Sequence, residues 1–288
     1  MVRFGPAGWS YKDWKGIVYP KKRPKDFHEA SYLANYFDTI EINTSFYYPI
    51  RPESARLWVE RVADNKNFRF TAKLWRGFTH ERNATPQDEQ AMKEGLDPLL
   101  AAGRLGALLL QFPWSFKNTD ADREYLSNLQ KHFQEYPLVL EVRHSSWAEP
   151  GVLDMLASLG IGLCNIDQPL FSRSIEPSAI STSPVGYVRL HGRNYQQWFT
   201  ENQNTGDRYN YLYSLKELEP WVARTKAIAE RAQDTYVVTN NHYVGKAVVN
   251  ALEMTSLLRA APVDAPPSLV EQYPILKEFT AQAGETLS

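Results

Sequence analysis

The chain has 288 residues, 43% of them hydrophobic and 23% charged, which excludes an intrinsically disordered protein. Its formal net charge of −1 excludes the uniformly basic surface that would hold a long polyanion nonspecifically. The single cysteine, Cys164, rules out an intramolecular disulfide. There is no signal-peptide pattern after Met1 and no apolar run of membrane-spanning length, so we expect a soluble, cytoplasmic protein.

Short apolar runs alternate along the chain with longer amphipathic segments. Eight runs have strand length and are rich in β-branched or aromatic residues: 2–7, 39–47, 69–75, 106–112, 138–144, 161–167, 186–193 and 235–242. Helical spacing occurs at 52–62, 86–102, 120–133, 150–159, 215–231 and 246–258. Thr85 and Asp88 mark the start of the second of these helices, and Gly103 marks its end.

Strands that alternate with helices predict a parallel sheet, and eight such units are what a (β/α)8 barrel requires. A doubly wound open sheet is the alternative, but the first turn, GPAGWSY, leads into a long irregular segment rich in Lys and Pro. We therefore predict an α/β protein with a single (β/α)8 TIM-type barrel over residues 1–288 and long loops after the strands. The barrel core is expected over about residues 2–260, followed by a short, Pro-rich C-terminal tail at 261–288.

Alternation along the strands sends most of their charged side chains into the barrel, near the end where active-site loops gather. The predicted inward set comprises Glu41, Asn43, Lys73, Gln111, Glu141, Arg143, Asn165, Asp167, Arg189, His191 and Arg193. In the sixth strand the same rule turns Cys164 and Ile166 outward. The last strand has no clear phase, so either Asn240 and His242 or Asn241 face inward. Such a cluster favours a functional site, with a purely structural ion-pair network as the alternative.

Aromatic residues follow the first two strands, among them Trp9 and Tyr47. Rings beside a polar site stack on sugars or bases, but rings also pack beneath long loops. We include both residues among the candidates for substrate binding, and the sequence leaves the two roles open.

Seven sequence blocks, in chain order, cover essentially the whole chain: GWSYKDWKGIVYP, EINTSFYYPIRPESARLW, FTAK with a following Thr79-His80, EVRHSSW, YVRLHGRN, YNYLYSLKELEPW and NNHYVGKAVVNALEM. Together they resemble the YecE-like family, domain of unknown function 72. The resemblance implies a TIM-type barrel and carries no established reaction. The recurrent polar positions of that family fall here on Glu41, Asn43, Lys73, Glu141, Arg143, His191, Arg193, Asn240 and Asn241.

The first functional hypothesis is an enzyme that acts by acid–base chemistry on a small anionic sugar or nucleotide. Its candidate catalytic residues are Glu41, Glu141, His191 and Lys73, because carboxylates in different environments divide acid and base roles. Basic side chains bind phosphate or carboxylate groups, and asparagine fixes hydroxyls. The candidate substrate-binding residues are Asn43, Arg143, Arg189, Arg193, Asn240, Asn241, Trp9 and Tyr47. The sequence requires no cofactor for this hypothesis and leaves hydrolase, lyase and isomerase reactions open.

Two alternatives place a different ligand at the mouth of the predicted barrel, the end where the C-terminal ends of the strands and the active-site loops gather. A metal-dependent phosphodiesterase or endonuclease IV-like nuclease would bind a divalent metal through Glu141, Asp167, His191 and His242. Neighbouring arginines argue against it, because they weaken cation binding. The third hypothesis is a non-catalytic module that binds a nucleotide or a nucleic-acid single strand, and the near-zero net charge disfavours it. The expected partner is a small anionic ligand, with nucleic acid second and no membrane, and the oligomeric state stays open.

Overall fold

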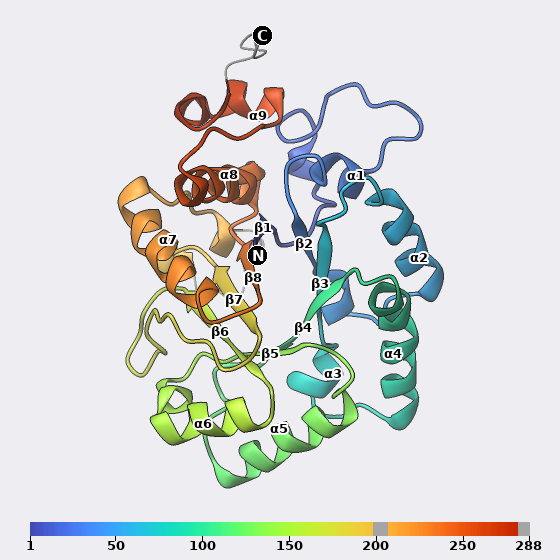
Figure 1. The fold of residues 1–288 in the computed structure, drawn as a ribbon, viewed down its shortest axis with the longest axis vertical. Helices are drawn as coiled ribbons and strands as arrows, with labels where there is room; N and C mark the ends of the chain where they lie inside the picture. Colours follow the sequence, from blue (N-terminus) through green and yellow to red (C-terminus); the bar gives the residue numbers. More distant parts are fainter. Residues whose placement is uncertain (198–206, 282–288) are drawn as a thin grey trace.

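A computed structural model describes residues 1–197 and 207–281, and eight strands form its centre. The strands are β1 (Val2–Pro6), β2 (Thr39–Ile42), β3 (Arg69–Lys73), β4 (Leu105–Gln111), β5 (Leu138–Glu141), β6 (Gly162–Asp167), β7 (Val185–Leu190) and β8 (Asp234–Thr239). Neighbouring strands pair in parallel in the order β1-β8-β7-β6-β5-β4-β3-β2. Figure 1 shows them surrounded by helices. The predicted (β/α)8 barrel is confirmed.

The barrel closes where β1 meets β2. Ala7 pairs with Glu41 in a parallel bridge, and the Gly8 N–H donates to the Glu41 carbonyl over 2.8 Å. The two strands lie very close together at Gly5, where a Cβ atom would be 1.8 Å from the carbonyl oxygen of Thr39. A side chain at this position would push the strands apart, so the seam of the barrel requires glycine.

The helices enclose the strands and largely follow them in turn (Figure 1). They are α1 (Glu29–Leu33), α2 (Pro52–Arg61), α3 (Arg76–Thr79), α4 (Pro86–Ala101), α5 (Asp120–His132), α6 (Pro150–Ser158), α7 (Leu215–Ala229), α8 (Lys246–Arg259) and α9 (Pro267–Gln272). Helix α4 begins at the predicted residues, where the Thr85 and Asp88 side chains each accept the other's backbone N–H in a capping box. Within the described ranges, none of the helices combines the length and apolar character needed to cross a membrane.

Several strands are shorter than their apolar runs predict, because the polar residues at their C-terminal ends leave the sheet. The run at 39–47 ends as a strand at Ile42, where the Ser45 hydroxyl donates to the Ile42 carbonyl and the chain enters a 3-10 turn, η2 (Thr44–Phe46). The runs at 138–144 and 235–242 also end early. Their last residues therefore line the mouth of the barrel instead of its wall.

Strand β6 has the opposite phase to the one predicted. Cys164 is in register with Tyr187, and Ile166 is in register with Arg189, whose side chain lies inside the barrel. In-register residues of parallel strands point the same way, so Asn165 and Asp167 face outward. The prediction was wrong because every residue of β6 is buried, which removes the contrast between its two faces.

The described part of the expected C-terminal tail folds against the barrel. Helix α9 and the 3-10 helix η7 (Pro274–Glu278) bury Leu269 and Leu276. The Tyr273 hydroxyl donates to the carbonyl of Val244, over 2.8 Å, in the turn after β8. In Figure 1 this segment lies beyond α8. Residues 282–288 of the tail lie outside the described residues.

Candidate functional site

An ion-pair network centred on Arg189 lies inside the barrel, near the C-terminal ends of the strands. Its Nη1 donates to Glu141 Oε2 over 2.6 Å, and its Nη2 donates to Glu41 Oε1 over 2.7 Å; all three side chains are fully buried. Burial alone would raise the pKa of each carboxyl, but the groups around it together more than offset this effect. Arg189 contributes most to this, with Lys73 beside Glu41 and with His191 and Arg143 beside Glu141. The pKa of Glu41 therefore lies below its ordinary value, and that of Glu141 lies well below. Both carboxylates are charged at neutral pH.

Lys73 connects this network to the mouth. Its Nζ lies 3.5 Å from Glu41 Oε1, and its side chain is 11% exposed. Burial, and next the positive charge of Arg189, lower the pKa of Lys73 to about 8, although the nearby carboxylates oppose this shift. At pH 7, about one Lys73 side chain in ten is therefore a neutral amine.

His191 is held from both sides of its ring. Nε2 lies 3.2 Å from Glu141 Oε1, and Nδ1 lies 3.0 Å from the amide nitrogen of Asn240. Burial lowers the pKa of His191 to about 4 in spite of the carboxylate, so the ring is neutral at pH 7. A neutral ring beside a carboxylate at Nε2 carries its proton there, which leaves Nδ1 to accept from Asn240. These contacts fix the orientation of the imidazole.

Side chains from around the barrel line a cavity of about 410 Å³ at the C-terminal ends of the strands. The residues on or just after strands are Asn43, Lys73, Gln111, Arg143, His191, Asn240 and His242. Loops add Tyr11, Phe46, Tyr47, Arg208 and Tyr209. This is the position at which (β/α)8 enzymes hold their substrates.

The cavity carries an excess of positive charge. Three cations, protonated Lys73, Arg143 and Arg189, face the two buried carboxylates, which leaves a net charge of +1. Arg208 in the lining adds a further cation. The carboxylates have no exposed surface, whereas Lys73 and Arg143 line the cavity. The field inside the cavity therefore favours an anionic ligand.

One wall of the cavity consists of rings and an amide. The rings of Tyr11 and His242 are stacked with centroids 4.3 Å apart, and Tyr209 packs 5.0 Å from His242. The Tyr11 hydroxyl donates to the Ala7 carbonyl over 2.6 Å, so it accepts from the Asn43 amide nitrogen at 3.2 Å. This fixes the orientation of the Asn43 amide. Among the described residues, the buried amide oxygen of Asn43 has no hydrogen-bond partner.

Comparison with known proteins agrees with the barrel fold. The family described as "Protein of unknown function DUF72" matches residues 3–272. The chain belongs to the DUF72 family. The UPF0759 protein YunF of Bacillus subtilis (strain 168) is 28% identical over 273 residues, which are 90% of this chain and 95% of YunF.

Solved structures of DUF72 proteins share the fold. A DUF72 family protein (TM1631) from Thermotoga maritima is 32% identical, with a TM-score of 0.77 over 90% of this chain and 99% of that chain. A DUF72 family protein (EF0366) from Enterococcus faecalis V583 is 25% identical, with a TM-score of 0.78 over 93% of this chain and 98% of that chain. An O-GlcNAc hydrolase mutant from Thermobaculum terrenum is 11% identical with a TM-score of 0.50, which is a likeness of fold alone.

Three of the predicted site residues of this DUF72 protein, Asp167, Arg193 and Asn241, point away from the barrel interior. Asp167, on the outer face of β6, accepts from Nε and Nη2 of Arg193, each over 2.9 Å. Arg193 Nη1 also lies 3.4 Å from Glu217 at the start of α7. Asn241 faces α8, where its amide donates to Asn250 over 2.8 Å. The inward orientation predicted for Asp167 and Arg193 is wrong, and the two form a separate ion pair between the sheet and α7.

Of the remaining predicted positions, some line the cavity and one packs against a helix outside it. The last strand takes the first of its two predicted phases, with Asn240 and His242 at the cavity. Tyr47 lines the cavity and is 54% exposed. Trp9 is not in the lining, because it packs edge-on against Trp58 of α2 with ring centroids 5.2 Å apart. Its aromatic ring serves the packing of the first loop.

The candidate metal ligands do not gather into one site. Glu141 and His191 are neighbours, but Asp167 lies outside the barrel in its pair with Arg193. Across residues 1–197 and 207–281, no group of three or more His, Cys, Asp or Glu side chains is arranged to hold a metal ion. These residues therefore do not fit the metal-dependent hypothesis.

Sequence reasoning missed site residues that loops deliver. Arg208 and Tyr209 reach the cavity from the short 3-10 turn η5 (Asp207–Tyr209) between β7 and α7. Tyr209 opens the sixth sequence block, YNYLYSLKELEPW, but no strand or helix pattern marks either residue. Gln168, just after β6, accepts a short hydrogen bond from Arg143. The Tyr187 hydroxyl donates to Glu41 Oε2 over 3.0 Å inside the barrel. Only the inward phase of β7 could have revealed Tyr187, as it did Arg189.

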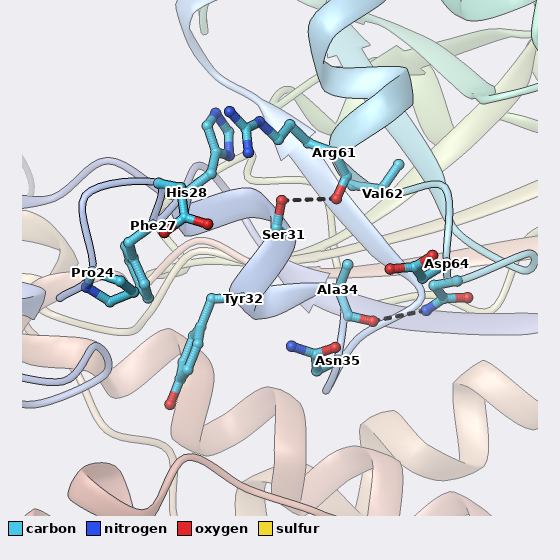
Figure 2. A pocket seen from close by; sticks show the side chains of 12 residues that line it. Pro24, Phe27, His28, Ser31, Tyr32, Ala34, Asn35, Arg61, Val62 and Asp64 are labelled. Atoms are coloured by element: carbon cyan, nitrogen blue, oxygen red, sulfur yellow. Dashed lines mark hydrogen bonds between the residues drawn. The ribbon is translucent and has the colours of Figure 1, made fainter.

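A second cavity, of about 510 Å³, lies outside the barrel (Figure 2). It is lined by two segments, 24–35 and 61–65. Figure 2 shows the contact between Ser31 and Arg61, in which the Ser31 hydroxyl donates to the Arg61 carbonyl over 2.8 Å. The Asn65 side-chain amide donates to the Ala34 carbonyl over 2.9 Å. Polar groups here tie α1 to the end of α2, so we place the candidate site at the mouth, where residues of many strands converge.

Proposed function

We propose that this DUF72 protein is an enzyme that binds a small anionic substrate at the barrel mouth and transfers a proton through Lys73. The position of Lys73 carries the proposal. Its amine lies at the boundary between a sealed ion-pair network and a positively charged cavity, and its pKa is about 8. A general acid or base is most effective when its pKa lies near the working pH.

The buried carboxylates act through other residues in this proposal. Glu41 holds the Lys73 ammonium at 3.5 Å, and Glu141 orients His191 at 3.2 Å. Both remain charged at neutral pH and have no surface in the cavity. They therefore act as positioning residues, and not as the acid and the base that the first hypothesis assigned to them. Arg189 keeps the two carboxylates apart and neutralised.

Arg143 binds the anionic group of the substrate. Its guanidinium lines the cavity, and its Nη2 donates to Glu141 over 3.1 Å. A second bond, to Gln168, fixes the other end of the planar group. A pre-oriented guanidinium suits the planar geometry of a carboxylate or the oxygens of a phosphate.

Proton transfer is tested by nuclear magnetic resonance in D2O with a panel of sugar phosphates and 2-oxo acids. We expect the wild type to incorporate deuterium into, or convert, at least one of them, with a rate that follows a group of pKa about 8. Lys73→Met should abolish the reaction. Lys131→Met, on the exposed face of α5, is the matched control and should retain it.

Two results would count against the proposal. An unchanged rate in Lys73→Met would remove the lysine from its role. Tight binding of an anion without exchange or product from any member of the panel would favour a non-catalytic binding module.

A further inference from the structure

The mouth cavity has two chemically different halves, and the order of the strands separates them. From β3 to β5 the lining comprises Lys73, Gln111 and Arg143, which we call the cationic half. From β8 across the β1 loop to β2 it comprises Asn240, His242, Tyr11 and Asn43, which we call the amide half. Burial lowers the pKa of His242 to about 4, so the amide half is uncharged at neutral pH.

The amide half offers hydrogen bonds to neutral groups. The Asn43 amide is oriented by Tyr11, and its oxygen retains its capacity to accept a hydrogen bond. The oxygen has almost no accessible surface in this structure, so a ligand hydroxyl completes it once the Asn43 side chain turns toward the cavity that it lines. Asn240, held through His191, adds a second amide at the same side.

The rings of the amide half, together with Tyr209 of η5, which packs against them, form a wall and not a slot. Tyr11 and Tyr209 both pack against His242, at 4.3 and 5.0 Å between ring centroids. These rings are engaged with one another, so a planar base would have to separate them before it could stack between them. Such a wall suits the flank of a compact, hydroxylated molecule.

We propose that the ligand is a polyol of monosaccharide size that carries one phosphate or carboxylate group. The anionic group lies in the cationic half, against Arg143, and the hydroxyls lie in the amide half, against Asn43 and Asn240. Lys73 on β3 then lies between the two parts of the ligand. A cavity of about 410 Å³ is near the lower end of the usual range for small-molecule sites. This inference rests on the proposed function and names its substrate class.

Isothermal titration of the full chain with five probes tests the proposal: inorganic phosphate, D-ribose, D-ribose 5-phosphate, D-ribonate and adenosine monophosphate. We expect ribose 5-phosphate or ribonate to bind about tenfold or more tightly than either phosphate or ribose, since one good hydrogen bond is worth about that factor. The comparison of ribose 5-phosphate with ribonate shows which anion the cationic half prefers.

Two variants separate the halves. Arg143→Gln should weaken binding of the preferred anionic sugar about tenfold or more, whereas Arg56→Gln, on the exposed face of α2, should leave it unchanged. Asn43→Ala should remove the advantage of the anionic sugar over inorganic phosphate and leave the affinity for phosphate as it was. Asn128→Ala, exposed on α5, is its control. Thermal unfolding of each variant shows whether it is folded.

Several outcomes would overturn the inference. One is an anionic sugar that binds no more tightly than inorganic phosphate; another is adenosine monophosphate that binds more tightly than ribose 5-phosphate. Equal weakening of phosphate and anionic sugar in folded Asn43→Ala is a third. If the anionic sugar binds as expected but Lys73→Met leaves turnover unchanged, the proposed function fails and this inference stands.

Discussion

Replacing Arg189 with methionine should make stability depend strongly on pH. The guanidinium bridges Glu41 and Glu141 at 2.7 and 2.6 Å with no exposed surface, so the variant leaves two buried carboxylates without their shared partner. Breaking a buried ion pair costs about 3–5 kcal/mol. Lys73 and Arg143 stay beside the carboxylates, so we expect the lower end, about 3 kcal/mol at pH 7.5.

The pH dependence follows from the two carboxyl groups. In the wild type their pKa values are lowered, so the stability that they contribute is present above the ordinary value of 4.5 and is lost only in acid. In Arg189→Met burial dominates and raises both pKa values, so stability is lost as the pH rises through them. The difference in unfolding free energy between wild type and variant should therefore widen from pH 5 to pH 7.5.

Urea unfolding followed by circular dichroism at the two pH values measures this difference. Arg104→Met is the matched control, because Arg104 is also buried but donates to the carbonyls of Asn65 and Phe68, at 2.7 and 2.9 Å. Its loss of stability should be the same at both pH values. A loss in Arg189→Met below about 1 kcal/mol, or one that does not change with pH, would refute the reasoning.

Three further predictions concern positions away from the network. Burial raises the pKa of Glu253 to about 7, so its contribution to stability falls as the pH rises above 4.5. In urea unfolding, the free energy of unfolding of Glu253→Gln should therefore rise by about 2–3 kcal/mol relative to that of the wild type between pH 5 and pH 8. Val244 is a β-branched residue at φ 52°, a strained backbone conformation that glycine adopts freely. Val244→Gly should therefore raise the unfolding free energy by about 1 kcal/mol, and a decrease of the unfolding free energy by that amount would show that Val244 is not strained. Gly5→Ala places a methyl group 1.8 Å from a backbone oxygen across the barrel seam and should lower the melting temperature by about 10 °C or more; an unchanged melting temperature would show that β1 and β2 can move apart freely.

Much of the candidate site could be predicted because most strands alternate visibly. The inward phase was correct for Glu41, Lys73, Glu141 and Arg189, where apolar neighbours mark the outer face. It failed in β6, where both faces are buried and Asn165 is satisfied by the backbone of Ile180 outside the barrel. A polar residue on the outer face looks the same in sequence as one on the inner face when a loop covers it.

The eight strands, the helices between them and the gathering of charged residues at the ends of strands could all be predicted from the chain, because they follow from the local alternation of apolar and polar residues. Which charges neutralise one another depends on how the strands assemble. Arg189 and Glu41 are 148 residues apart, and their pairing removes Glu41 from the cavity and leaves Lys73 at its surface. The division of the cavity into a cationic and an amide half likewise depends on which strands are neighbours after the barrel closes, and that closure joins β1 to β2 through contacts between distant segments.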